Sequence, residues 1–293
     1  MRMLTKSKGA DKILPGLLAL LPLCLGAAER PYFVTYDHEL EEPGNFEVSI
    51  NPVLGVPKEG NKFLGSWTEF EYGVKGWWTT EFYLDGQKTS RDSAIFTGFR
   101  WENRFRPLMK EHWINPVLYV EFESLNGADK TLLEVVNHDS ADDLAVPNHE
   151  ARSEKKHEME GKLILSSNFK GWNVSENFIA EKNLNNNPWE FGYAFGVNRP
   201  LALIASSRRC RLCRENFRSG VELYGGLGTR HAFGFPGTSH YVAPILAWEL
   251  PNGTSLRISP TLGLNKNSVR TLLRFGVSYE IPRFDRRIRR WFR

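Results

Sequence analysis

The segment from Ser268 to Ile281 alternates between apolar and polar or small residues over its whole length. The positions that could face hydrocarbon hold Val269, Thr271, Leu273, Phe275, Val277, Tyr279 and Ile281. A period of two predicts a strand rather than a helix. A strand in a soluble protein is usually about five or six residues long, whereas a tilted strand that crosses a bilayer needs about 9–11 residues. These fourteen residues are therefore long enough to span a membrane as a strand.

The same alternation recurs along the chain and predicts twelve strands. We place them at residues 46–54, 68–75, 78–85, 95–104, 114–123, 160–169, 172–182, 189–198, 216–229, 240–250, 255–264 and 268–281. Bacterial single-chain barrels have an even number of antiparallel strands with one outward and one inward face each. The pattern predicts an all-β fold, a transmembrane up-and-down antiparallel β-barrel over residues 44–281.

The lengths of the connections give an independent check. If both termini are periplasmic, short turns and long loops alternate between the two sides of the membrane. The predicted periplasmic turns are 73–76, 106–111, 168–171, 205–214 and 251–253, and the predicted outer loops are 56–65, 87–92, 126–159, 183–188, 229–239 and 266–267. Only the turn at 205–214 is longer than its side predicts. A soluble β-sandwich would also alternate, but its loops would not sort in this way. We expect the charged loop at 126–159 to be solvated and mobile.

The two ends of the chain carry different signals. Residues 1–28 have a basic start, a short apolar core and small residues before Glu29, which predicts a secretory signal peptide. Residues 29–43 are then an acidic periplasmic segment and residues 282–293 a basic periplasmic tail, and we expect both to be solvated. The net charge of +4 comes mainly from that tail, so it does not indicate nucleic-acid binding.

The predicted inward faces carry charges of both signs. The expected lumen-lining residues are Glu69, Glu71, Glu81, Arg100, Glu102, Arg104, Glu121, Glu123, Arg257, Arg270 and Arg274. Such groups cannot face lipid cheaply, because an arginine at the bilayer midplane costs about 2–4 kcal/mol. A barrel of twelve strands leaves two possibilities open, a narrow polar pore and an interior plugged by ion pairs. Of the two, we favour the pore.

Few residues suggest a redox, metal-binding or catalytic role. Cys210 and Cys213 could close a small disulfide in a basic turn, which an oxidising compartment would allow. Two cysteines do not complete a zinc site, so no metal, cofactor or catalytic residue is predicted. A His-x-Ser pair, His138 and Ser140, resembles that of the outer-membrane phospholipase, itself a twelve-stranded barrel, but it falls in a predicted loop rather than on a strand.

The closing sequence RFGVSYEI resembles the assembly signal of outer-membrane barrels, with Arg274, Gly276, Tyr279 and Ile281 at the matching positions. The acidic start YDHE and the early Trp- and Gly-rich hairpin resemble outer-membrane β-barrel proteins of the transporter type assigned to the meta-pathway of phenol degradation. The resemblance implies a Gram-negative outer-membrane location after export, with outer-membrane lipid and the barrel-assembly machinery as partners. It transfers no binding residues.

The function that this pattern favours is a channel or transporter for small solutes, a porin-like role without enzymatic activity. Two alternatives stay open. One is a barrel enzyme such as an outer-membrane hydrolase, and the other is a structural or adhesion barrel that acts through its extracellular loops. The sequence does not identify the solute.

Overall fold

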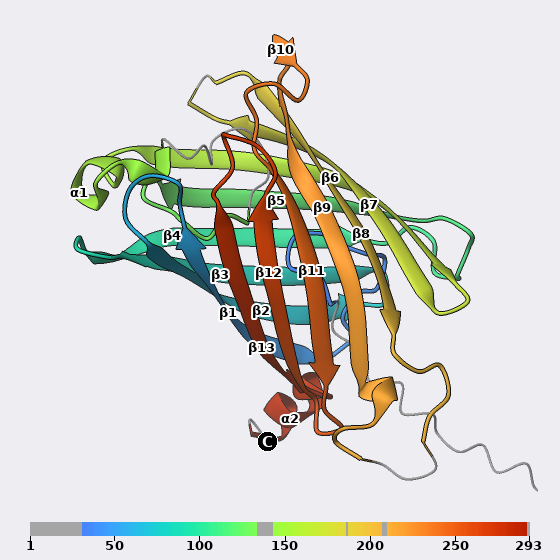
Figure 1. Ribbon diagram of the computed structural model, residues 1–293. Helices are drawn as coiled ribbons and strands as arrows, with labels where there is room; N and C mark the ends of the chain where they lie inside the picture. Colours follow the sequence, from blue (N-terminus) through green and yellow to red (C-terminus); the bar gives the residue numbers. More distant parts are fainter. Residues whose placement is uncertain (1–30, 134–142, 186, 207–209, 292–293) are drawn as a thin grey trace, which may run out of the picture.

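The computed structural model describes residues 31–133, 143–185, 187–206 and 210–291. Twelve long strands form the wall of a barrel (Figure 1). They are β1 Phe46–Val56, β2 Phe63–Lys75, β3 Trp78–Thr89, β4 Ala94–Phe105, β5 Asn115–Asn126, β6 Lys155–Phe169, β7 Trp172–Asn183, β8 Trp189–Pro200, β9 Phe217–Thr229, β11 His240–Glu249, β12 Thr254–Gly263 and β13 Thr271–Ile281. The two-residue strand β10, Ala232–Phe233, only extends β9 in a hairpin.

Every wall strand pairs antiparallel with its neighbours in the sequence, and the first strand closes on the last. In this closing pair, Phe46 of β1 lies opposite Ile281 of β13. The pairing of β8 with β9 completes the ring, with Phe195 opposite Leu223. The wall strands are 10 to 15 residues long, as membrane-crossing strands need to be. The predicted twelve-stranded antiparallel barrel is confirmed.

Residues along each strand alternate between a buried inward face and an outward face. In β13, Arg274 and Ser278 are buried in the interior, whereas Phe275 and Val277 are exposed on the outside. Among the described residues, no helix is long and apolar enough to cross a membrane. The outward band of aliphatic and aromatic side chains is what a hydrocarbon environment requires.

Most connections at one end of the barrel are short turns, and the other end carries the longest loop, between β5 and β6 (Figure 1). The long connection between β8 and β9 is the exception, because it lies with the short turns. The end with the short turns also carries helix α2, Phe284–Trp291, and the 3-10 turn η2, Arg214–Asn216. The other end carries the longer loops, including η1, Asp143–Ala145, and helix α1, Asn148–Ala151. We call these the short-turn end and the long-loop end.

Two segments fold into the interior, and both were expected to be solvated. Residues 31–38, expected as part of an acidic periplasmic tail, are all buried, and Tyr32 has no exposed surface. Residues 128–133, expected as part of a mobile loop, are also buried except for Asp129, which is half-buried. Both expectations are wrong here because the inward wall offers these segments a dense set of hydrogen-bonding partners.

The basic tail is likewise not simply solvated. It contains helix α2, whose Phe284 ring stacks on the Phe46 ring with centroids 4.6 Å apart. The backbone nitrogen of Arg283 donates a hydrogen bond to Oδ1 of Asn45 at 2.9 Å. The tail is therefore fixed to the rim of the barrel next to the first strand.

Candidate functional site: the occupied lumen

Arg104 lies at the centre of one ion-paired group on the inward wall. Its Nη2 atom is 2.6 Å from Oε1 of Glu71 and also pairs with Glu81 on β3. Its Nε atom is 2.9 Å from Oε1 of Glu102 on the same strand. The guanidinium is only 2% exposed, so its charge is balanced by these carboxylates rather than by water.

Arg100 joins the wall to the inserted segment 128–133. Its Nε atom is 2.8 Å from Oδ2 of Asp85, and Nη2 donates to Oγ1 of Thr131 at 2.8 Å. Thr131 belongs to the inserted segment, as does Asp129, which lies 3.4 Å from the same Nη2 atom. The sequence therefore places an arginine where the loop needs both a counter-charge and a donor.

Arg257 and Arg274 bind main-chain carbonyl groups of the inserted segments. Nη1 of Arg257 donates to the carbonyl oxygen of Tyr32 at 2.8 Å. Nη1 of Arg274 donates to the carbonyl oxygen of Thr131 at 3.3 Å, and Nη2 donates to that of Leu132. Each arginine thus holds one segment against the wall.

The N-terminal segment is bound like an extended peptide, but by side chains instead of by strand pairing. Oε1 of Glu222 accepts hydrogen bonds from the backbone nitrogens of Val34 and Thr35 at 2.8 and 2.7 Å. Asn177 accepts from the Tyr36 nitrogen at 2.6 Å and donates to its carbonyl oxygen at 2.8 Å. The main-chain polar groups of a buried segment need such partners. The wall supplies them without including the segment in the sheet.

Glycine in the wall makes room for this segment. A Cβ atom on Gly196 would lie 2.5 Å from Cε1 of Tyr32, closer than real contacts allow. The Tyr32 hydroxyl passes beyond it and donates to Oδ1 of Asn173 at 2.9 Å. Position 196 therefore needs a residue without a side chain for the segment to be seated.

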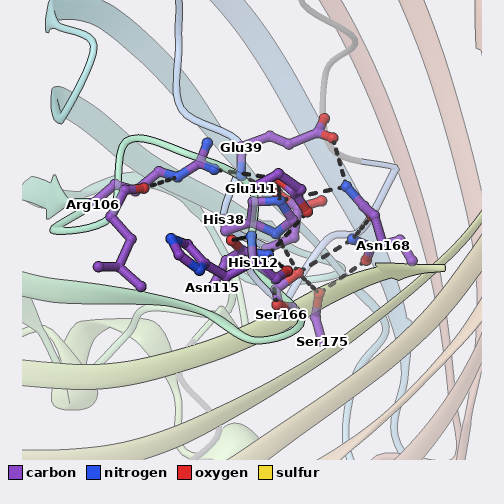
Figure 2. A network of polar contacts seen from close by, with 12 residues as sticks. His38, Glu39, Arg106, Glu111, His112, Asn115, Ser166, Asn168 and Ser175 are labelled. Atoms are coloured by element: carbon purple, nitrogen blue, oxygen red, sulfur yellow. Dashed lines mark hydrogen bonds and ion pairs between the residues drawn. The ribbon is translucent and has the colours of Figure 1, made fainter.

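A polar network surrounds His38 near the short-turn end (Figure 2). His38 Nδ1 is 2.7 Å from Oγ of Ser166, and its Nε2 is 3.0 Å from Oε2 of Glu111. Ser166 Oγ also accepts hydrogen bonds from Asn173 Nδ2 at 3.3 Å and Ser175 Oγ at 2.9 Å. Arg106 holds the Glu111 carboxylate from the other side at 3.3 Å. This network fixes His38, the end of the continuously buried run 31–38, to β6, β7 and the β4–β5 turn.

The segment then leaves the interior past Glu41. This side chain is buried and its Oε1 accepts a hydrogen bond from the Glu42 nitrogen at 3.0 Å. Burial raises the pKa of the Glu41 carboxyl to about 7, and repulsion from the Glu280 carboxylate adds to the shift. The exit of the segment thus carries a group that titrates near neutral pH.

A small cavity of about 10 Å³ lies where the two inserted segments meet. Tyr32 and Phe33 line it from one segment, Leu133 lines it from the other, and Trp67 lines it from the wall. That volume has room for about one water molecule. Together with the buried ion pairs of Arg100 and Arg104, the small size of this cavity favours the plugged, ion-paired interior over the open pore expected from the sequence.

Ten of the eleven residues expected to line the lumen lie buried on inward faces. They are Glu69, Glu71, Glu81, Arg100, Glu102, Arg104, Glu121, Glu123, Arg257 and Arg274. Arg270 does not join them: it precedes β13 and is exposed, because the regular strand begins only at Thr271. Val269, expected to face hydrocarbon, is fully buried for the same reason. That the ten residues line a conducting path stays a prediction.

Several important residues were not singled out from the sequence. Lys162 pairs with Glu160 at 2.7 Å inside β6, and Glu222 binds the N-terminal segment from β9. Both strands had been predicted, and extending the inward parity along them would have identified these side chains. The segment itself has no period of two, so nothing in its pattern indicated where it binds.

The other residues singled out from the sequence are the two cysteines, the assembly signal and the His-x-Ser pair. Cys210 and Cys213 are joined by a disulfide in the connection between β8 and β9, with Cα atoms 5.4 Å apart. Arg274 and Gly276 of the expected assembly signal face inward, and Tyr279 faces outward. The pair His138 and Ser140 lies outside the described residues.

No protein-family model matches the chain, and no curated protein matches it. Solved structures do resemble it. The COG4313 outer membrane channel from Pseudomonas putida F1 aligns with a TM-score of 0.54 and 11% identity, over 84% of this chain and 98% of that one. A KdgM porin in complex with disordered oligogalacturonate aligns with a TM-score of 0.51 and 6% identity, over 80% and 98%. At these identities the likeness concerns the fold. The chain has the fold of outer-membrane channel barrels.

Proposed function

We propose that this protein is an outer-membrane channel for small solutes and that residues 31–38 are its removable plug. The observation that carries the proposal is how the segment is held. Glu222 and Asn177 bind its main chain through side chains, and no strand of the sheet includes it. Its departure would leave all twelve wall strands paired and would expose the part of the charged interior that residues 128–133 do not occupy.

The charges of the wall indicate which solutes such a lumen favours. Among the described wall strands, the buried charged side chains comprise twelve carboxylates and five cationic groups. Charges that line a narrow path act strongly on passing ions because the path is partly desolvated. The excess of carboxylates favours cations and neutral polar molecules. It argues against a polyanion such as the oligogalacturonate named with the KdgM porin.

The experiment is a measurement of reversal potential with the refolded mature protein in planar bilayers. Under a salt gradient, we expect potassium to be preferred over chloride, and the preference to weaken at high salt as screening grows. Replacing Glu69 and Glu71 by glutamine should reduce the preference. An anion preference, or no effect of the two substitutions, would contradict the proposed solute class.

The location belongs to the same proposal. Residues 1–28 would be removed on export, and Arg274, Gly276, Tyr279 and Ile281 would be read by the barrel-assembly machinery. Sequencing of the mature N-terminus from isolated outer membranes should begin at Glu29. Substitution of Tyr279 and Ile281 by serine should lower the amount of folded barrel in the membrane. A mature chain that starts elsewhere, or unchanged assembly, would count against these assignments.

A hydrolase is the second candidate, because Ser166, His38 and Glu111 form a chain of hydrogen bonds like that of a serine nucleophile, its base and an orienting carboxylate. We rank this candidate second because Ser166 is buried and already hydrogen-bonded. Its side chain is only 2% exposed, and its Oγ atom already accepts from Asn173 and Ser175. For catalysis, an acyl carbon would have to approach Oγ of Ser166 to about 3–3.5 Å, and this buried, hydrogen-bonded position gives it little access.

An active-site-directed fluorophosphonate separates the two candidates. A channel with a structural serine should not be labelled, in the same way as a Ser166→Ala variant. Labelling of the wild type that is lost in Ser166→Ala and in His38→Ala would establish the hydrolase.

A further inference from the structure

Helix α2 presents two chemically different surfaces at the short-turn end. Phe284 and Ile288 are one turn apart and are half-buried, so they share the face toward the barrel. The other face is cationic and exposed, with Arg286, Arg287, Arg289 and Arg290. The single acidic residue of the helix, Asp285, lies 3.9 Å from Arg289. An exposed face of several arginines is attracted to anionic lipid headgroups.

The helix is attached at a defined point of the outward wall. Phe284 stacks on Phe46, the first residue of β1, which in turn stacks on Phe70 of β2 with centroids 6.3 Å apart. The backbone nitrogen of Asp285 donates to the carbonyl oxygen of Gly44 at 3.2 Å. The arginines are therefore held at the rim, next to the lipid-facing surface of β1 and β2.

An apolar groove starts at the same residue. It has a volume of about 880 Å³, and Phe46, Phe70, Phe82, Trp101, Phe122 and Met159 are among the residues that line it. From Phe70 to Met159 these side chains are direct cross-strand partners on successive strands. A row across the strands is oblique to the membrane, because barrel strands are tilted by about 35–45°. The groove thus leads from the rim toward the long-loop end.

We propose that this groove and helix α2 together bind one anionic phospholipid of the periplasmic leaflet. The acyl chain lies along the aromatic row, since hydrocarbon chains are what surrounds this face in a bilayer. The phosphate group binds the arginines of α2, whose guanidinium groups suit phosphate oxygens in charge and geometry. The proposal concerns the outer surface and goes beyond conduction through the lumen, requiring only that the barrel is inserted in the membrane with its short-turn end on the periplasmic side.

The test is photo-crosslinking of the full mature chain in phosphatidylcholine nanodiscs that contain phosphatidylglycerol with a diazirine on its acyl chain. Labelling should map to β2, β3 and β4, and unlabelled phosphatidylglycerol should compete much better than phosphatidylcholine. In the double variant Arg286→Glu, Arg287→Glu the labelling should fall at least about tenfold, because each arginine near an anionic surface contributes about fivefold. Arg211→Glu with Arg214→Glu is the matched control, since it makes the same charge change at another point of the same end and should leave labelling unchanged.

Equal labelling in the wild type and the α2 variant, or equal competition by the two lipids, would overturn the proposal and leave ordinary boundary lipid. Heat-modifiable gel mobility verifies that each variant is folded. If the α2 variant does not fold, the wild type still decides the question. Raising the salt from about 0.1 M to about 1 M should reduce the preference for phosphatidylglycerol over phosphatidylcholine. A preference that does not respond to salt would also overturn the proposal.

Discussion

The Glu222 carboxylate on β9 accepts a hydrogen bond from the backbone nitrogen of Thr35 at 2.7 Å, although 187 positions separate the two residues in the sequence. The same oxygen accepts from Val34, and the second oxygen accepts from Phe33 at 3.2 Å. One wall carboxylate therefore satisfies three consecutive main-chain groups of the plug. This relationship makes Glu222 one of the main wall contacts of residues 31–38, beside Asn177 and Arg257.

Replacing Glu222 by alanine should loosen the plug. Hydrogen bonds to a charged group contribute about 1.5–3 kcal/mol, so even one of the three lost contacts shifts plug occupancy by about tenfold or more. We expect single-channel records of Glu222→Ala to show at least about ten times more open time than the wild type. Glu59→Ala removes an exposed loop carboxylate and should behave like the wild type. If the Glu222 variant and this control have the same open time, Glu222 does not hold the plug.

A side chain at position 196 should expel the plug by a different route. Gly196→Leu would place atoms where the Tyr32 ring now lies. The wall backbone is held on both sides by strand pairing, so we expect the Tyr32 ring to move. The variant should show increased open time even though Glu222 is intact. Tyr32→Ala in the same background removes the clash and should restore part of the closed time. Failure of this rescue would mean that the substitution acts on the wall rather than on Tyr32.

Open time should rise with pH through the titration of Glu41. Its pKa is about 7 when buried and about 4.3 in an unfolded or displaced segment. A raised pKa stabilises the seated form fully below about pH 4 and loses that effect as the pH rises through about 7. Recordings between about pH 4 and pH 8 should therefore show more opening toward pH 8. Glu41→Gln cannot ionise and should flatten this dependence; an unchanged pH profile in this variant would assign the titration to another group.

The position of β13 in the membrane can be tested by placing an arginine at two different depths on its outward face. Phe275 and Tyr279 are both exposed on the outer face, but Phe275 is near the middle of the strand and Tyr279 near its end. An arginine at the bilayer midplane costs about 2–4 kcal/mol, whereas one near the interface costs about 0–1 kcal/mol. The free energy of unfolding in lipid vesicles should therefore drop much more for Phe275→Arg than for Tyr279→Arg. Equal losses would contradict the position of the membrane along this strand.

The wall of this barrel could be predicted from the sequence because a strand with two different environments keeps a strict period. Arg100 and Glu102 have the parity that places both inside, and the structure buries both. The same rule failed at Arg270, because the alternation in the sequence starts before the paired strand does, and β13 begins only at Thr271. Alternation in the sequence therefore shows which side chains face the lumen only within a paired strand.

The contents of the lumen could not be predicted in this way. Residues 31–38 follow no period, and their partners Glu222 and Asn177 are polar residues like many others on the inward faces. The acidic and charged composition of this segment and of the 126–159 loop suggested solvated chain. Inside a charged barrel, however, polar main-chain groups find more partners than they would against an apolar core.

The decisive measurement for the plug compares the single-channel conductance of the wild type with that of a chain that lacks residues 31–38. Both would be recorded as mature proteins with all twelve wall strands, and heat-modifiable mobility would verify folding. We predict brief or rare openings in the wild type and a stable, larger, cation-preferring conductance in the deletion variant. A folded deletion variant that conducts no more than the wild type would contradict the claim that these residues are a removable plug in a solute channel.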